Sequence, residues 1–413
     1  MPTPPAGHRR FPCRQPGSRG HSMRIAIFDY KVRRTNPIGR CHLRLMEALC
    51  DRHEFTVFAP EFENPRPDRI RHVRVPTPLR PLVAQFFAYH LLAPVAHWWA
   101  RRRGAFDLVM CVESNLLHAD IVHTHFCHHA YARGRTGWGD PGLVTWLRRI
   151  DHMVRAWSEP LVYRSPKLVV VPSNGLRREL ETEFPHLANR VEVIANPIDT
   201  KRLVRPADFD AGEVRRELGF GPDDLVLTFV ALGHFERKGL PLVLEAMRKL
   251  GRSDLKLAVV GGRTETIASY RDKAAGLGLS GQVAFTGMRD DVRPWLWAAD
   301  AFVFPSQYET FSLVSYEAAA AGLPIVVTKL HGVEDFARDG DTALVVERSA
   351  DEVASALLHL YEMGPEGRRH MGAKAAAAVS GFTTESFVAG WRRVLNELES
   401  RDQETQAVGT VAP

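Results

Sequence analysis

The sequence predicts an α/β protein made of two doubly wound parallel-sheet domains. The first observation is size, because 413 residues with an apolar fraction of 45% exceed the usual length of one domain. The second is that short apolar strands alternate with helical stretches in both halves, as in a parallel sheet covered by helices. The third is the turn-forming segment Asn196-Pro-Ile-Asp199, which divides the chain near its middle.

The first half is predicted to form a domain over residues 23–200. It opens with an apolar strand at 24–28, followed by a loop containing Asn36-Pro-Ile-Gly39 and a helix over about 40–49. Further short apolar runs predict strands at 55–58, 108–111, 121–123, 168–171 and 191–194.

The second half is predicted to form a domain over residues 201–383. Its apolar runs predict strands at 225–230, 255–260, 283–285, 301–304 and 324–327. We expect loops at 233–239 and 306–312, each leading into a helix, at 240–250 and 313–321 respectively. A last helix is expected over about 384–399.

Both ends of the chain are predicted to be disordered tails. Residues 1–22 hold four arginines and no acidic residue and are rich in Pro and Gly, and residues 400–413 are polar. The first tail lacks the apolar segment of a secretory signal. Because Met23 stands directly before the first strand, we hypothesise that the functional chain starts there.

The charge is divided unevenly along the chain. The net charge is +6, with +7 in residues 23–200 and −5 in residues 201–413. A basic half suits an anionic membrane, an acidic substrate or nucleic acid, but no nucleic-acid recognition motif accompanies it. The composition excludes collagen-like, coiled-coil and wholly disordered classes. The five cysteines show no disulfide spacing, which indicates a reducing compartment such as the cytoplasm.

One stretch of the first half is unusually apolar. Residues 82–100 contain no Asp, Glu, Lys or Arg and are followed by Arg101-Arg-Arg103. The length approaches that of a membrane span, but Gln85, His90, Pro94 and His97 interrupt it inside a predicted domain. We favour a helix packed in or on the domain. A surface helix that dips into a bilayer is the second interpretation, because aromatic pairs and an arginine cluster suit it.

The segment Phe304–Pro324 holds the most informative pattern. A loop between a strand and a helix places backbone N–H groups at a helix N-terminus, where anions bind. Glu309 lies in this loop, and Glu317 lies one to two turns into the helix. Two glutamates eight residues apart are usually solvated surface charges, so this pair means little without the residues around it.

Those surrounding residues resemble a known signature. Glu309-Thr-Phe-Ser, the spacing to Glu317-Ala and the following Ala-Gly-Leu-Pro324 are similar to the signature of retaining glycosyltransferases of family 4, also described as glycosyl transferases group 1. The resemblance covers about residues 23–395 and extends to other stretches, namely 193–199, 235–239, 260–262, 285–287 and 299–306. It implies the GT-B fold, in which two Rossmann-like domains face each other across a cleft, with the helix at 384–399 crossing back to the first.

The resemblance also implies roles for individual residues. Glu309 and His125 would contact the transferred sugar, and Glu317 would contact the ribose hydroxyls of the donor. Backbone groups at Phe311, Ser312 and Leu313 would hold the diphosphate or the sugar, Gly287 and Met288 would lie near the base, and Gly39 would approach the donor phosphates. The sequence has Ser312 where the family often has glycine, which bears on the sugars that fit. The single glycine at position 39 is a weak signal, and an ordinary turn is the alternative interpretation.

Arg237 and Lys238 suit the chemistry of this family. Departure of a nucleotide diphosphate requires positive charge, which these two residues supply without a metal from a loop that follows a strand. In the family an arginine usually follows the loop glycine directly, whereas here His234 does, in a loop one residue shorter. We therefore expect Arg237 to replace that arginine.

The segment Ala119–His129 is rich in metal-ligating residues, with His123, His125, Cys127, His128 and His129. Alternation along a strand sends neighbouring side chains to opposite faces, and no second ligand pair stands at a zinc spacing. We therefore expect no metal site, with His123 packed inside the domain and His128 and His129 on the acceptor side or at the surface. No dinucleotide fingerprint, nucleophile elbow or Walker loop is present, and we expect no cofactor.

The sequence thus predicts an enzyme that transfers a sugar from a nucleotide-diphosphate sugar to an acceptor hydroxyl with retention of configuration. The resemblance points to polysaccharide, cell-envelope or glycolipid synthesis, with a sugar, a polyol or a lipid-linked acceptor. The basic first domain and the stretch 82–103 suggest peripheral contact with an anionic membrane. Two alternatives remain at this point, namely a nucleotide-sugar epimerase of the same fold and a non-catalytic sugar- or membrane-binding module.

Overall fold

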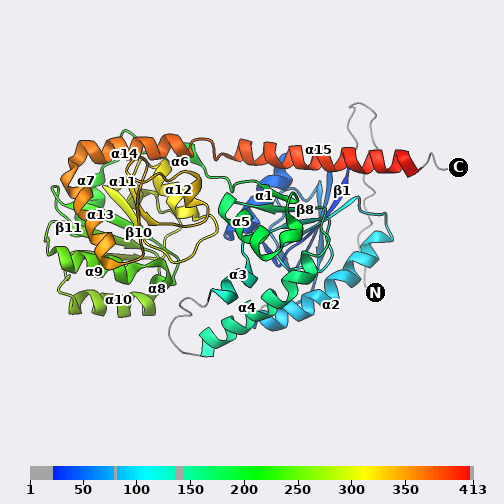
Figure 1. The fold of residues 1–413 in the computed structure, drawn as a ribbon, viewed down its shortest axis with the longest axis horizontal. Helices are drawn as coiled ribbons and strands as arrows, with labels where there is room; N and C mark the ends of the chain where they lie inside the picture. Colours follow the sequence, from blue (N-terminus) through cyan, green and yellow to red (C-terminus); the bar gives the residue numbers. More distant parts are fainter. Residues whose placement is uncertain (1–21, 79–80, 135–142, 410–413) are drawn as a thin grey trace, which may run out of the picture.

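The computed structural model describes residues 22–78, 81–134 and 143–409. Figure 1 shows two α/β domains side by side, joined near the middle of the molecule, with one long helix returning from the second domain to the first. The predicted basic tail at 1–22 lies almost entirely outside the described residues.

The first domain is built on a seven-stranded parallel sheet in the order β5-β3-β1-β6-β7-β8-β9. Its strands are β1 (Arg24–Phe28), β3 (Glu54–Ala59), β5 (Ile70–Arg74), β6 (Leu108–Val112), β7 (Ile121–His123), β8 (Leu168–Val171) and β9 (Val191–Val193), and a separate ribbon pairs β2 (Lys31–Val32) with β4 (Glu61–Phe62). Its helices are α1 (Pro37–Leu49), α2 (Leu82–Arg101), α3 (His128–Arg133), α4 (Leu143–Val162), α5 (Asn174–Glu183) and the short η1 (Pro185–Leu187).

The second domain has a six-stranded parallel sheet in the order β12-β11-β10-β13-β14-β15. Its strands are β10 (Leu225–Val230), β11 (Leu255–Val260), β12 (Val283–Gly287), β13 (Ala301–Phe304), β14 (Ile325–Thr328) and β15 (Leu344–Val346). Its helices are α6 (Thr200–Leu203), α7 (Ala211–Glu217), α8 (Phe235–Lys238), α9 (Leu240–Leu250), α10 (Thr264–Gly276), α11 (Arg293–Ala298), α12 (Leu313–Ala320), η2 (Val333–Asp335), α13 (Ala350–Glu362) and α14 (Gly364–Val379).

The strand orders confirm the predicted fold class. In each sheet the strand that comes first in the chain, β1 or β10, lies inside the sheet with later strands on both sides, which is the doubly wound arrangement. The central strands are buried on both faces, as their continuous apolar runs predict. Such a sheet binds ligands at the carboxyl ends of its strands, where the strand order reverses.

Helix α15 (Thr384–Gly409) leaves the second domain and packs against α1 of the first. Phe387, Trp391 and Leu395 are buried in the same core as β1 and β3. The prediction that this helix ends near residue 399 and gives way to a disordered tail was wrong. The helix continues to Gly409 because residues 401–408 are mostly helix-compatible polar residues without proline or glycine.

The apolar stretch 82–100 forms α2, which packs on the first domain through Phe86, Tyr89 and Ala93. Among the residues that the structure describes, no helix is long and apolar enough to cross a membrane. The favoured interpretation of a helix packed on the domain therefore agrees with the structure.

Candidate active site between the domains

A pocket of about 300 Å³ opens between the two domains. Helix α1 and the segment 196–203 form one side, and the segments 290–293 and 310–317 form the other. Four arginines line it, namely Arg40, Arg44, Arg202 and Arg293, together with three aspartates, Asp199, Asp290 and Asp291. The pocket thus has the size of a small-molecule site and offers several guanidinium groups to an anionic ligand.

Four residues predicted to bind the donor line this pocket, namely Phe311, Ser312, Leu313 and Glu317. Ser312 precedes α12 in the left-handed conformation, with φ at 58°, and its hydroxyl lies 2.7 Å from that of Ser315. A left-handed backbone favours glycine, which gives a physical reason for the glycine that the resemblance places here. No side chain caps α12, so its first N–H groups remain available to an anion.

The carboxyl of Glu317 changes its ionisation near neutral pH. Burial raises the pKa of its carboxyl to about 7, an effect that the charge of Arg40 opposes. Arg40 comes from the first domain and Glu317 from the second, so the ionisation of this carboxyl depends on how the domains meet.

A second cluster in the second domain joins Lys238 to Glu309. The Lys238 ammonium forms an ion pair with Glu309 Oε1, which also accepts a hydrogen bond from Ser306 Oγ at 2.9 Å. Burial lowers the pKa of Lys238, and the nearby carboxylate of Glu309 opposes that shift. Arg237 donates from Nη1 to the carbonyl oxygen of Tyr308 at 2.8 Å, which ties its loop to that of Glu309.

The predicted loop 233–239 contains one turn of helix, α8, which is a correction to the sequence interpretation. His234 and Gly239 flank α8 in left-handed conformations, with φ of 56° and 87°. Phe235 is buried in the domain core and anchors the turn. A side chain at Gly239 would meet the carbonyl oxygen of Pro305 at 2.2 Å, so this glycine allows the two loops to approach closely.

His125 lies at the carboxyl end of β7 and reaches the linker between the domains. Its Nε2 lies 3.2 Å from Asn196 Oδ1, and Asn196 lines the pocket. Burial, together with the charge of His42, lowers the pKa of His125 to about 4. The imidazole is therefore neutral near pH 7.

His123 is fully buried, where the sequence analysis expected a packed residue. Its Nδ1 lies 2.8 Å from His42 Nε2, and its ring packs against that of Trp391 from α15. Among the described residues, no group of three or more His, Cys, Asp or Glu side chains has the arrangement of a metal site.

The remaining predicted donor residues lie outside the pocket. Gly39 is inside α1, where an added side chain would meet the backbone nitrogen of Arg33 at 2.7 Å. Gly287 ends β12 and bridges to Gly261, while Met288 is largely exposed. The pocket is reached instead by their neighbours in sequence, Arg40 and the segment 290–293.

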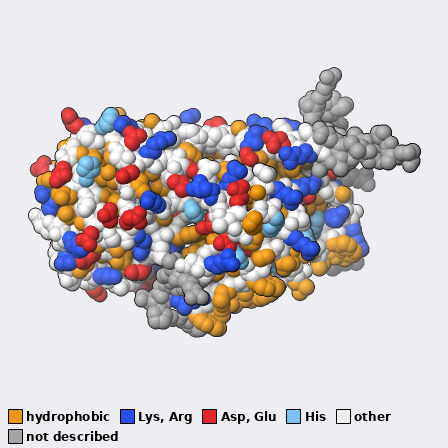
Figure 2. Space-filling view, in the orientation of Figure 1, with side chains coloured by type: hydrophobic (Ala, Val, Ile, Leu, Met, Phe, Trp, Pro, Cys, Tyr) orange, Lys and Arg blue, Asp and Glu red, His pale blue; other side chains and the backbone are white. Residues whose placement is uncertain are grey.

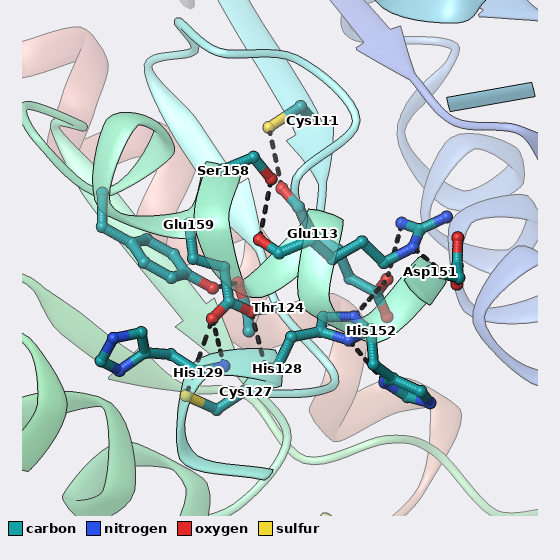
Figure 3. Close-up of polar contacts among 12 residues, drawn as sticks. Cys111, Glu113, Thr124, Cys127, His128, His129, Asp151, His152, Ser158 and Glu159 are labelled. Atoms are coloured by element: carbon teal, nitrogen blue, oxygen red, sulfur yellow. Dashed lines mark hydrogen bonds and ion pairs between the residues drawn. The ribbon is translucent and has the colours of Figure 1, made fainter. Parts of the chain in front are cut away.

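A buried polar cluster on α3 and α4 was missed by the sequence analysis (Figure 3). Arg155 pairs with Asp151 at 3.2 Å and with Glu113 at 3.8 Å, and His128 Nδ1 lies 2.9 Å from His152 Nδ1. Asp151, Arg155 and Glu159 are spaced four residues apart, so they occupy one face of α4. This spacing was the signal available in the sequence, but charged residues on one helical face ordinarily indicate a solvated surface.

Glu159 of this cluster caps helix α3. Its two carboxylate oxygens accept hydrogen bonds from the backbone N–H groups of His128 and His129, both at 2.7 Å. Burial raises the pKa of Glu159 to about 8, and these two N–H groups oppose the shift. The cap holds α3 immediately after His125, on the side of the first domain that faces the Glu309 loop.

Helix α5 makes direct contact with the second domain, a relationship that no sequence pattern indicated. Ser173 Oγ donates to the carbonyl oxygen of Thr310 at 2.7 Å, and Arg178 pairs with Glu334 at 2.6 Å. Glu179 accepts from Tyr308 OH at 2.8 Å and lies 3.1 Å from His331 Nε2. Two of these contacts hold Tyr308 and Thr310, the residues on either side of Glu309.

Two sequence profiles match the chain. Residues 38–202 match the profile described as Glycosyltransferase Family 4, and residues 225–363 match the one described as Glycosyl transferases group 1. Over 315 residues the chain is 30% identical to the D-inositol 3-phosphate glycosyltransferase of Actinosynnema mirum, an alignment that covers 66% of this chain and 72% of that enzyme.

Solved structures of low sequence identity share the fold. WaaG, a glycosyltransferase involved in lipopolysaccharide biosynthesis, has a TM-score of 0.71 and 19% identity, covering 88% of this chain and 98% of WaaG. Anabaena HepE in complex with UDP-glucose has a TM-score of 0.67 and 17% identity, covering 91% of this chain and 100% of HepE. These similarities confirm the predicted GT-B arrangement of two facing domains.

Proposed function

This chain belongs to the glycosyltransferases of family 4, and we propose that it transfers a sugar from a nucleotide-diphosphate sugar to an acceptor hydroxyl with retention of configuration. The observation that carries the proposal is the ion pair between Lys238 of α8 and Glu309, which lies on the loop that leads into the uncapped α12. A cation and a carboxylate beside free helical N–H groups suit a sugar bonded to a diphosphate.

The donor is proposed to span both clusters. Its nucleotide part occupies the pocket, where Glu317 accepts hydrogen bonds from the ribose hydroxyls and the N–H groups at 312–313 hold phosphate oxygens. The transferred sugar lies towards Glu309 and His125. The complex of Anabaena HepE with UDP-glucose supports a donor of this class. Arg237 and Lys238 supply the positive charge, so the proposed reaction needs no metal or cofactor.

Retention is proposed to follow from attack on the same face that the leaving group occupies. The bond between the anomeric carbon and the phosphate oxygen breaks, and the acceptor oxygen forms the new bond on that face. The acceptor proton moves to the departing phosphate oxygen, so no enzyme nucleophile is required. The protein contributes positioning and a preorganised electrostatic field.

The acceptor is proposed to approach from the first domain and to belong to polysaccharide, cell-envelope or glycolipid synthesis. The lipopolysaccharide named for WaaG supports this class, and the inositol phosphate named for the Actinosynnema relative supports a polyol acceptor. We place the reaction in the cytoplasm, consistent with the four free, buried cysteines among the described residues. We also propose peripheral contact of the basic first domain with an anionic membrane surface.

The experiment that tests this function begins with a thermal-shift panel of nucleotides and sugar nucleotides, which selects the donor. The purified protein is then incubated with that donor, with and without a panel of sugar, polyol and lipid-linked acceptors. We expect a glycosylated product only when an acceptor is present. Nuclear magnetic resonance should show that the transferred sugar has the same anomeric configuration in the product as in the donor. Isomerised donor formed without an acceptor would instead identify an epimerase, and binding without any turnover would identify a non-catalytic module.

A further inference from the structure

Helix α4 has its polar face turned inwards and its apolar face turned outwards. Asp151, Arg155 and Glu159 are buried against the domain. On the opposite side Met153 and Trp157 are 54% and 70% exposed, and Leu161 is exposed as well. A helix that faces water carries its charged residues outside, so this reversed arrangement indicates that the outer face of α4 meets an apolar medium.

Helix α2 extends this apolar surface. It packs beside α4, and the two helices run together along one edge of the first domain (Figure 1). Large apolar side chains of both helices are exposed, and we call the surface that they form the α2–α4 face. It consists of Leu82, Phe87, Leu91, Val95, Trp98, Trp99, Met153, Trp157 and Leu161. In Figure 2 hydrophobic side chains gather along the lower edge of the first domain, where α2 and α4 lie in Figure 1. Contiguous apolar patches of this kind mark interaction surfaces.

The charge at the end of α2 identifies the kind of partner. Arg101, Arg102 and Arg103 follow directly after Trp98 and Trp99, and all three are exposed. The guanidinium carbon of Arg102 lies 3.8 Å from the ring centroid of Trp98 and 4.4 Å from that of Trp99. Within the described ranges none of the three arginines is paired with a carboxylate. Aromatic rings bordered by unpaired arginines are typical of proteins that bind the interface of an anionic bilayer.

We propose that the α2–α4 face docks the first domain onto an anionic lipid bilayer, with α2 and α4 lying in the interface and Arg101–Arg103 contacting lipid phosphates. The reversed polarity of α4 also relates this surface to the proposed site of the reaction. Its outer face meets lipid, while on its inner side His152 packs against Phe126 and Tyr131. Both of these rings contact Tyr308, the neighbour of Glu309. A lipid-linked acceptor could thus keep its chain in the bilayer and its polar head beside α4. The docking part of this inference deepens the membrane contact proposed above, and the acceptor part rests on the proposed transfer reaction.

The experiment measures sedimentation of the full chain with vesicles of phosphatidylglycerol and phosphatidylcholine, and with vesicles of phosphatidylcholine alone. We expect binding to the anionic vesicles at low salt, weakened at least tenfold by 0.5 M salt. The double variant W157S/L161S and the triple variant R101Q/R102Q/R103Q should each weaken binding about tenfold or more. The variant L358S removes an exposed leucine from the second domain and should bind like the wild type, as should R248Q/K249Q.

Two controls separate this inference from the proposed function. Thermal shifts with the selected donor should be the same in wild type and in all these variants, because none of the substituted residues lines the pocket. Failure of the wild type to bind anionic vesicles at low salt would overturn the inference and leave the donor chemistry untouched. A wild-type dimer that W157S/L161S converts to a monomer, without vesicle binding, would overturn it in favour of a second copy of the chain.

Discussion

The hydroxyl of Tyr308 in the second domain donates a hydrogen bond to Glu179 in the first, at 2.8 Å. Tyr308 stands next to Glu309, so this bond links the proposed sugar site to α5 across the domain boundary. Burial and the charge of Glu179 raise the pKa of Tyr308, which keeps its hydroxyl protonated as a donor.

Removing this bond should weaken donor binding while the fold survives. We expect E179A and Y308F each to raise the KM for the donor about two- to tenfold, the range that one lost hydrogen bond supports. The double variant should be no worse than E179A alone, because both substitutions remove the Tyr308–Glu179 bond and only E179A also removes the contact of Glu179 with His331. E181Q on the same helix alters only the local pair with Arg177 and serves as control. Fully additive effects in the double variant would refute the link.

Replacement of Lys238 or Glu309 should abolish most of the transfer. K238A and E309A each remove one member of the buried ion pair at the proposed reacting centre, and we expect kcat/KM to fall about 10²–10³-fold or more. Circular dichroism should show that both variants remain folded. The matched control E245Q changes a carboxylate paired with an arginine on the surface of α9. Full activity in either site variant would contradict the site assignment.

Donor affinity should depend on pH through Glu317. With a pKa near 7, its carboxyl is mostly ionised at pH 8 and mostly protonated at pH 6, and only the ionised form accepts from both ribose hydroxyls. We expect the dissociation constant of the donor to rise about tenfold from pH 8 to pH 6. Calorimetry on E317Q should show weaker binding at pH 8 and no such slope. An equal slope in E317Q would place the titrating group elsewhere.

The same carboxyl affects the stability of the ligand-free protein, with a defined sign. Its pKa is higher in the folded protein than the ordinary value of 4.5, so the folded state binds more protons between about pH 4.5 and 7. The contribution of Glu317 to the free energy of unfolding therefore falls as pH rises through this window. Denaturant titrations of wild type and E317Q should converge at low pH, with E317Q becoming relatively more stable towards pH 8.

Trp391 should be essential for the stability of the first domain. It is fully buried among first-domain residues although it belongs to the last helix of the chain. We expect W391A to lower the free energy of unfolding by about 3–5 kcal/mol, with chemical denaturation as the measurement. The neighbouring Arg392 is exposed, so R392A should change stability by less than about 0.5 kcal/mol. Comparable losses in both variants would argue against a core role for Trp391.

The central strands and the helix after Ser312 could be predicted because apolar runs and turn residues report them locally. The edge strand at Ile70–Arg74 was missed, since its alternating exposed residues dilute the apolar signal. Pairings such as Lys238 with Glu309 and Arg178 with Glu334 join residues 71 and 156 positions apart, and no local pattern encodes them. The inward orientation of the charged residues of α4 could not be predicted, because charged residues of a surface helix usually face solvent.

The return of α15 also determines how the two domains can move. The chain passes between them twice, once at 194–200 and once at 380–384, and the two passages are joined by a hydrogen bond from Ile198 N to Phe382 O at 2.9 Å. Gly390 lies against Ile194 at the same place, where a larger residue would crowd the isoleucine side chain. Because the two crossings lie side by side, we expect the domains to rotate relative to each other about an axis through them. The same crossings should restrict sliding of one domain past the other. The contact of Ser173 with Thr310 joins other segments of the two domains, so we expect an opening motion to break it while the Ile198–Phe382 bond remains.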